Sequence, residues 1–241
     1  MKYGETSFDI IYLILAILFS SYIIVKRKNK AHLLMGIAIL VLAFGDAFHL
    51  IPRIINYFAP SDNVNVVLGV GKFITSITMT AFYVFLYHVY IEQFDVKPNK
   101  ALTIIFYVLT AIRIALLIPP QNGWFTNENN LILGIVRNIP FFVMGVIIIV
   151  LFFQKRNVYK ILWPMWLYIT LSFAFYIPVV VGTEFVPMLG MFMIPKTICY
   201  LIMFGTYSVF VKKEIAQTDL DNQSNSLDTT SNAWTITLSI S

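Results

Sequence analysis

Seven stretches of the chain are almost entirely apolar, and each is close to the length that a helix needs to cross a lipid bilayer. They are separated by short polar segments and lie at about residues 8–25, 31–57, 67–91, 101–118, 131–153, 161–182 and 187–211. A helix crosses the hydrocarbon with roughly 20 residues, whereas a barrel strand needs about half that number with alternating polarity. Because backbone groups in lipid must be satisfied within each segment, the sequence predicts an all-α integral membrane protein, a bundle of seven transmembrane helices.

Composition supports this class and excludes others. Apolar residues make up 59% of the chain, charged residues only 12%, and the mean hydropathy is +0.78, far from the usage of soluble domains. Cys199 is the single cysteine, which excludes an internal disulfide and a cysteine metal cluster. We attribute the net charge of +5 to membrane topology and intramembrane cations, so we expect no nucleic-acid partner. The expected partners are membrane lipids, and the expected location is the plasma membrane.

The basic residues outside the apolar cores predict an orientation. Eleven of them follow the first, third, fifth or last stretch: Lys26, Arg27, Lys28, Lys30, Lys97, Lys100, Lys155, Arg156, Lys160, Lys212 and Lys213. The opposite connections, residues 58–66, 119–130 and 183–186, contain no Lys or Arg. Cytoplasmic loops carry such an excess, so we expect the N-terminus outside and the C-terminus inside. Residues 1–213 then form the transmembrane domain, and the polar residues 214–241 form a loose cytoplasmic tail.

Weak internal similarity suggests a parallel repeat. "AFHLIPR" in the second stretch aligns loosely with "AFYIPVV" in the sixth, and "LGVGK" in the third aligns with "LGMFMIPK" in the seventh. Stretches 1–3 and 5–7 would then be copies joined by the fourth, a 3+1+3 arrangement that some transporters use. The alternative is that any two apolar helices containing Ile-Pro resemble each other.

Ionisable side chains interrupt the second stretch. Asp46, His49 and Arg53 are spaced at i, i+3 and i+7, so on a helix they project from one face. Four further cations come from other stretches but fall in the same predicted half of the bilayer: Lys72, Arg113, Arg137 and Lys196. A charge facing lipid costs about 2.5 to 3.5 kcal/mol even on insertion scales, so all five cations are expected to face the interior of the bundle.

Counter-charges for these cations are scarce. Asp46 is the only acid within a span at that depth, with Asp9 and Glu184 nearer the outer ends. One reading is an outward-facing cavity that binds an anionic small molecule or lipid headgroup through arginine and lysine donors. The other is an internal salt-bridge network in which Asp46 pairs with one or two cations. The candidate ligand-binding residues are Arg53, Lys72, Ser76, Arg113, Arg137, Asn138, Tyr176 and Lys196.

Three function classes remain open at this stage. A transporter or receptor for an anion is favoured by the repeat and by the helix-interrupting prolines Pro52, Pro140, Pro178 and Pro195. A membrane enzyme acting on a phosphorylated or carboxylated lipid would use Asp46 and His49 as catalytic acid and base. A structural bundle is the third reading. Trp124, in an outer connection, is interpreted as an interfacial anchor.

Two features of the sequence resemble those of known membrane-protein families, and no cofactor or metal is expected. Lys196 resembles in its placement the Schiff-base lysine of seven-span retinal proteins, but the third stretch carries Lys72 and no acidic counter-ion pattern. "FGD" (44–46) and "LYHVY" (86–90) resemble fragments of the lysoplasmalogenase family, but no second intramembrane aspartate motif follows. His88 and Glu92 are spaced like metal ligands but have no third ligand nearby in sequence.

Overall fold

The computed structural model describes residues 2–60, 64–126 and 130–238, with side chains described for residues 3–220 outside the same gaps. It is all-helical over those residues, and seven of its helices are long and apolar enough to cross a membrane, as the sequence predicts. They are α1 (Lys2–Val25), α2 (Lys30–Phe58), α3 (Val64–Gln93), α4 (Lys100–Leu117), α5 (Leu131–Gln154), α6 (Met165–Gly182) and α7 (Met193–Leu238). Two short 3₁₀ turns, η1 (Pro120–Asn122) and η2 (Pro187–Phe192), precede α5 and α7.

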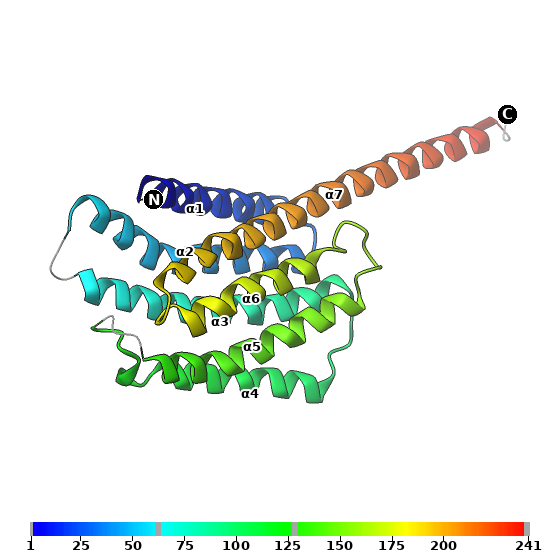
Figure 1. Cartoon of the computed structure of the whole chain (residues 1–241). Coiled ribbons are helices and arrows are strands. Elements are labelled where there is room, and N and C mark those ends of the chain that lie inside the picture. Colours follow the sequence, from blue (N-terminus) through cyan, green and yellow to red (C-terminus); the bar gives the residue numbers. More distant parts are fainter. Residues whose placement is uncertain (1, 61–63, 127–129, 239–241) are drawn as a thin grey trace.

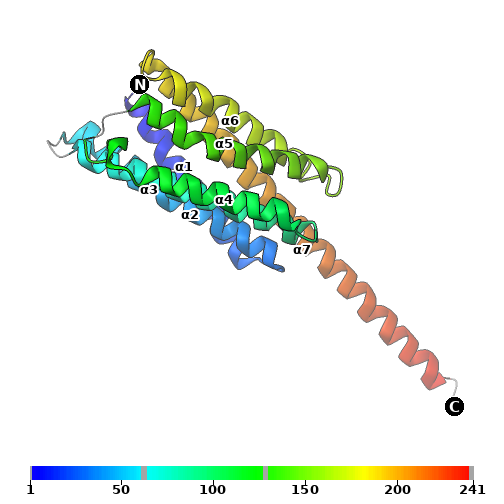
Figure 2. The same cartoon turned by 90° about the horizontal axis from the view of Figure 1, so that it is seen from below.

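The helices run up and down in alternation (Figures 1 and 2). The α1–α2, α3–α4 and α5–α6 connections lie at one end of the bundle. We call it the basic end, because the eleven Lys and Arg residues named above lie in or beside these connections and in the part of α7 that passes them. The N-terminus and the remaining connections lie at the other end, the η end, which carries η1 and η2. The α2–α3 pair has the most extensive packing, and α7 packs on both α1 and α6. The sidedness of the bundle in a membrane and the 3+1+3 repeat stay predictions.

Asparagine side chains determine where three of the helices begin. Asn29, Asn99 and Asn130 each accept a hydrogen bond from a backbone N–H in the first turn of α2, α4 and α5, respectively. An N-cap of this kind satisfies amides that have no partner within the helix. The sequence predicts a sixth span from about residue 161, but α6 begins at Met165, directly after Pro164.

A proline and a glycine bring α2 and α3 into close contact. Pro52 has no N–H, so the carbonyl of Phe48 four residues earlier loses its helical partner. Gly71 of α3 packs against that carbonyl, and a Cβ at this position would clash with the Phe48 oxygen. Gly45 of α2 packs in the same way against Thr78, whose hydroxyl would clash with an added Cβ. Small residues allow this approach, which positions α2 and α3 beside each other at the η end.

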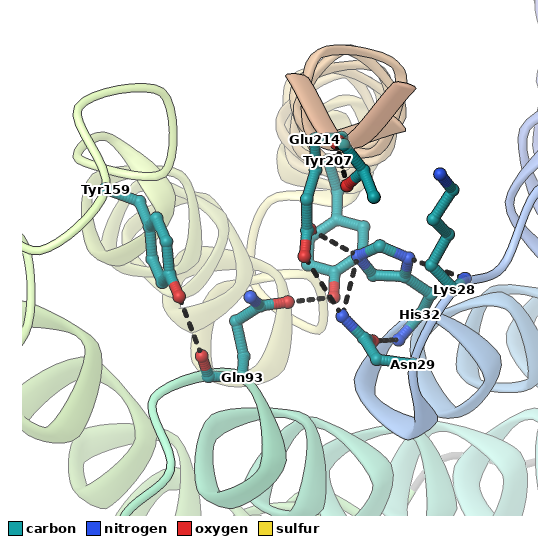
Figure 3. Close-up of polar contacts among 8 residues, drawn as sticks. Lys28, Asn29, His32, Gln93, Tyr159, Tyr207 and Glu214 are labelled. Atoms are coloured by element: carbon teal, nitrogen blue, oxygen red, sulfur yellow. Dashed lines mark hydrogen bonds and ion pairs between the residues drawn. The ribbon is translucent and has the colours of Figure 1, made fainter. Parts of the chain in front are cut away.

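The sequence predicts a loose cytoplasmic tail after Lys213, and this stays a prediction. α7 is continuous from Met193 to Leu238 and projects beyond the other helices (Figures 1 and 2). Near the basic end, Glu214 lies 2.9 Å from Nε2 of the buried His32, and Lys28 pairs with Asp219 at 3.1 Å. Figure 3 shows His32, Asn29 and Glu214 converging beside Tyr207. The first residues after Lys213 therefore contact the α1–α2 connection, whereas the division into two domains at that point stays a prediction.

Candidate functional site

A cavity of about 290 Å³ at the η end is lined by residues from α2 to α7. It contains seven of the eight predicted ligand-binding residues: Lys72, Ser76, Arg113, Arg137, Asn138, Tyr176 and Lys196. Such a volume is near the lower end of ligand pockets in proteins and suits a headgroup of phosphate size with a small substituent. We refer to it as the cation cavity.

Two arginines in the cation cavity are held by rings and neutral oxygens. Arg113 is only 2% exposed, lies over the Phe141 ring at 5.3 Å and donates to the backbone carbonyl of Arg137. Arg137 lies 4.4 Å from the centroid of the Trp124 ring and donates to Oδ1 of Asn122 at 2.7 Å. These contacts fix both guanidinium groups without neutralising them. The Nε atom of Arg113 is buried without a hydrogen-bond partner among the described residues.

Lys196 occupies a comparable setting on α7. Its ammonium lies 4.6 Å from the ring centroid of Tyr176 and 5.7 Å from that of Tyr200. Tyr176 in turn donates its hydroxyl proton to Oδ1 of Asn138 at 3.0 Å, which links α6 to α5. Pro195 was expected to interrupt this span, but it lies in the first turn of α7, where a missing N–H costs no helical hydrogen bond.

Lys72 and Ser76 belong to the wall that α3 contributes. Both line the cavity, and the Ser76 hydroxyl donates to the backbone carbonyl of Lys72 at 2.8 Å. The serine is thus held by its own helix, and its oxygen retains capacity to accept. Both candidate residues therefore reach the same cavity.

The cavity carries an excess of positive charge among the described residues. Four of its lining side chains are cationic, and Glu184 is the one acid in that lining. Over the described residues, none of Arg113, Arg137 and Lys196 forms an ion pair with a carboxylate. The internal salt-bridge network weighed from the sequence therefore does not account for these three side chains.

Arg53 and Asp46 lie elsewhere, in a second cavity of about 480 Å³ between α1, α2 and α7. Arg53 pairs with Asp9 at 2.6 Å. Asp46 accepts a hydrogen bond of 2.5 Å from the Tyr12 hydroxyl and forms no ion pair among the described residues. From the sequence, Arg53 is grouped with the other four cations, and one of the two alternatives pairs Asp46 with one or two cations. In the structure α1 supplies the partners of both side chains.

His49 lines both cavities, as does Lys196, so the two spaces adjoin at these side chains. No hydrogen bond joins His49 to Asp46 in the part of the chain that is described, and Nδ1 of His49 is buried without a partner there. An acid and base acting together on one substrate would need to approach the same reacting atoms. Their use as a catalytic pair stays a prediction.

Aromatic packing lies between the cation cavity and the basic end. Tyr83 is fully buried, and its hydroxyl lies 3.1 Å from that of Tyr200. The Tyr83 ring packs edge-on against Phe141 and Phe173 at centroid distances of 5.0 and 5.6 Å. Because Phe141 also lines the cavity, this cluster forms its floor.

Sequence reasoning missed two residues of the connection between α4 and α5. Trp124 is buried to 6% exposure, and its indole N–H donates to the Leu117 carbonyl at 2.7 Å. Its ring therefore packs within the protein beside the cavity, while its role as an interfacial anchor stays a prediction. Asn122 is also buried and donates to three backbone carbonyls while accepting from Arg137. The signal is the dipeptide Asn122-Gly123: Gly123 has φ 71°, which turns the chain back over the cavity.

Comparisons with known proteins found no matching family, no matching curated protein and no matching solved structure.

Proposed function

We propose that the cation cavity binds an anion carrying a phosphate or carboxylate group, entering from the η end, and that this binding serves transport or sensing across the membrane. The observation that carries the proposal is the way in which Arg113, Arg137 and Lys196 are held. Rings and neutral oxygens position these cations, and no ion pair to a described carboxylate neutralises them. Guanidinium forks and ammonium groups suit the oxygens of such anions.

Energetics support an anion as the missing counter-charge. Uncompensated cations in a low-dielectric interior are costly, and like charges converging on one space repel each other. A bound anion relieves both costs. Since a ligand that binds only the folded state stabilises it by mass action, an anion at 100 times its Kd adds about 2.7 kcal/mol to the free energy of unfolding.

The first prediction tests this binding directly. Adding phosphate or a small organic phosphate to the detergent-solubilised protein is expected to raise its melting temperature, on the order of 5 °C or more at saturating ligand. Arg137→Gln and Lys196→Met should abolish the shift while the protein remains folded, because each removes a donor from the cavity.

Arg156 provides the matched control for Arg137. It too stacks on a ring, with 3.8 Å from its guanidinium carbon to the Phe153 centroid, and donates to a backbone carbonyl, but it lies at the basic end. Arg156→Gln should therefore respond to phosphate like the parent. Phosphates and carboxylates that all leave the melting curve unmoved, or an Arg137→Gln variant that responds fully, would contradict the proposal.

A further inference from the structure

An apolar groove lies on the outer side of the wall that encloses the cation cavity. It has a volume of about 250 Å³ and runs between α5 and α6. Eight of its ten lining residues are Ile, Val or Phe, among them the exposed Ile139, Phe142, Ile177 and Val181. In a membrane these side chains face the hydrocarbon.

The groove and the cation cavity share part of their walls. Asn138, Phe141, Tyr176 and Val180 line both spaces. The Tyr176 ring faces the Lys196 ammonium on the cavity side, and its hydroxyl bonds to Asn138 across the two helices. The partition between a cationic space and an apolar one is thus a single layer of side chains.

The backbone beside this partition lacks two helical hydrogen bonds. Pro140 of α5 and Pro178 of α6 each lie within two residues of the Asn138–Tyr176 contact. A proline removes the bond to the carbonyl four residues earlier and weakens the helix locally. Separating α5 from α6 at this level therefore breaks one side-chain hydrogen bond in helices that are already interrupted.

A second apolar groove shows that lipid-facing hollows alone do not make such a site. It lies between α1, α6 and α7 and is lined by residues such as Phe19, Ile202 and Val209. It shares no lining residue with the cation cavity and contains no charged side chain. Of these two grooves, the α5–α6 groove is the one that shares its wall with the cation cavity over the described residues.

We infer that the anion in the cation cavity is the headgroup of a lipid-like amphiphile whose alkyl chain lies in the groove between α5 and α6. This inference rests on the proposed anion binding and names its ligand class. The charge of the cavity selects a phosphate or carboxylate head, and the continuity of the two spaces places the chain. The headgroup then lies in the cavity at the η end, and the alkyl chain extends from it into the groove between α5 and α6.

The test compares phosphates that differ only in their chains. Melting temperatures are measured in a neutral detergent with inorganic phosphate, butyl phosphate and dodecyl phosphate. Each methylene buried from water favours binding by roughly fourfold, so dodecyl phosphate is expected to reach its midpoint at a concentration at least about tenfold below that of butyl phosphate. Ile177→Trp, which fills the groove, should remove most of that advantage and leave the butyl phosphate response intact.

Ile202→Trp is the matched control, because Ile202 is an equally exposed isoleucine in the groove that does not join the cavity, 46% exposed against 43% for Ile177. Partition of dodecyl phosphate into micelles affects both variants alike, so their difference isolates the groove. Val181→Trp is the second blocking variant if Ile177→Trp does not fold. An unchanged dodecyl phosphate midpoint in the folded blocking variant overturns the inference, while a butyl phosphate shift that Arg137→Gln removes keeps the proposed function. No shift with any phosphate overturns both.

Discussion

The Asp46 carboxylate is held by a tyrosine rather than by a cation. The Tyr12 hydroxyl lies 2.5 Å from it and is itself fully enclosed, with a residue exposure of 1%. Hydrogen bonds to charged groups contribute more than neutral ones, and a buried carboxylate that loses its donor pays its full desolvation cost. This contact anchors α1 to α2 deep in the bundle.

Replacing Tyr12 with phenylalanine is expected to lower the free energy of unfolding by about 2 kcal/mol, because Asp46 then lacks its donor. In an Asp46→Asn background the same change should cost about 1 kcal/mol or less, since a neutral partner is easier to leave unpaired. Chemical denaturation of the four proteins in detergent measures this cycle. His49→Gln serves as the comparison and should destabilise less than Asp46→Asn, and equal losses from Tyr12→Phe in both backgrounds would refute the coupling.

The residues show where sequence reasoning stops. Counting along the spans was sufficient to place Lys72, Arg113, Arg137 and Lys196 at one depth. Their inward orientation also follows from the sequence, because a charged side chain that faces lipid costs free energy. The same counting grouped Arg53 with them. Its pairing with Asp9 depends on how closely α1 approaches α2, a tertiary property that one helix face does not encode. The burial of Trp124 beside the cavity could not be predicted either, because a loop that folds inward has no periodicity.

At the level of helices, the α2–α3 contact is the tightest feature near the site. Gly71 lies against the Phe48 carbonyl that Pro52 leaves without a helical partner. A glycine at this position lets the two backbones approach closely, because it has no Cβ to fill the space beside the Phe48 carbonyl. The pair therefore sets the distance between the helices that carry His49 and Lys72.

Gly71→Ala is expected to destabilise the protein by about 1 to 3 kcal/mol, because the added Cβ meets backbone that cannot move aside without shifting a helix. Gly134→Ala is the control, since Gly134 is also helical but has no atom within 4 Å of an added Cβ. That change should be neutral or slightly stabilising. Thermal or denaturant unfolding of both variants decides the matter, and equal stability of the two would show that α2 and α3 separate readily.

At the scale of the whole molecule, the lengths of the seven apolar stretches were sufficient to predict the number of membrane-spanning helices. The ends of the helices are harder to predict from the sequence. In the structure α7 continues beyond the other helices, whereas composition predicts a loose tail after Lys213. Composition describes how a segment interacts with water, and it is a weak guide to whether a helix already begun in the membrane continues. The orientation of the bundle likewise rests on the basic residues alone.

Orientation is open to direct measurement. A reporter fused after Lys213 should be cytoplasmic, and one inserted near Asn127, which lies outside the described residues, should be external, because eleven cations mark the basic end. Protease protection or a compartment-specific enzyme fusion reads out each position. Finding the Asn127 site inside would turn the cation cavity toward the cytoplasm and reverse the side from which its ligand arrives.

Trp124 is placed to act as an intrinsic fluorescent probe of the cation cavity. Its indole ring borders the cation cavity and lies against Arg137, while the other tryptophans, Trp163, Trp166 and Trp234, lie outside that lining or beyond the described side chains. Indole emission responds to nearby charge and to water. With the other three replaced by phenylalanine, the protein would report the filling of its cavity through its own fluorescence, without a dye and at equilibrium.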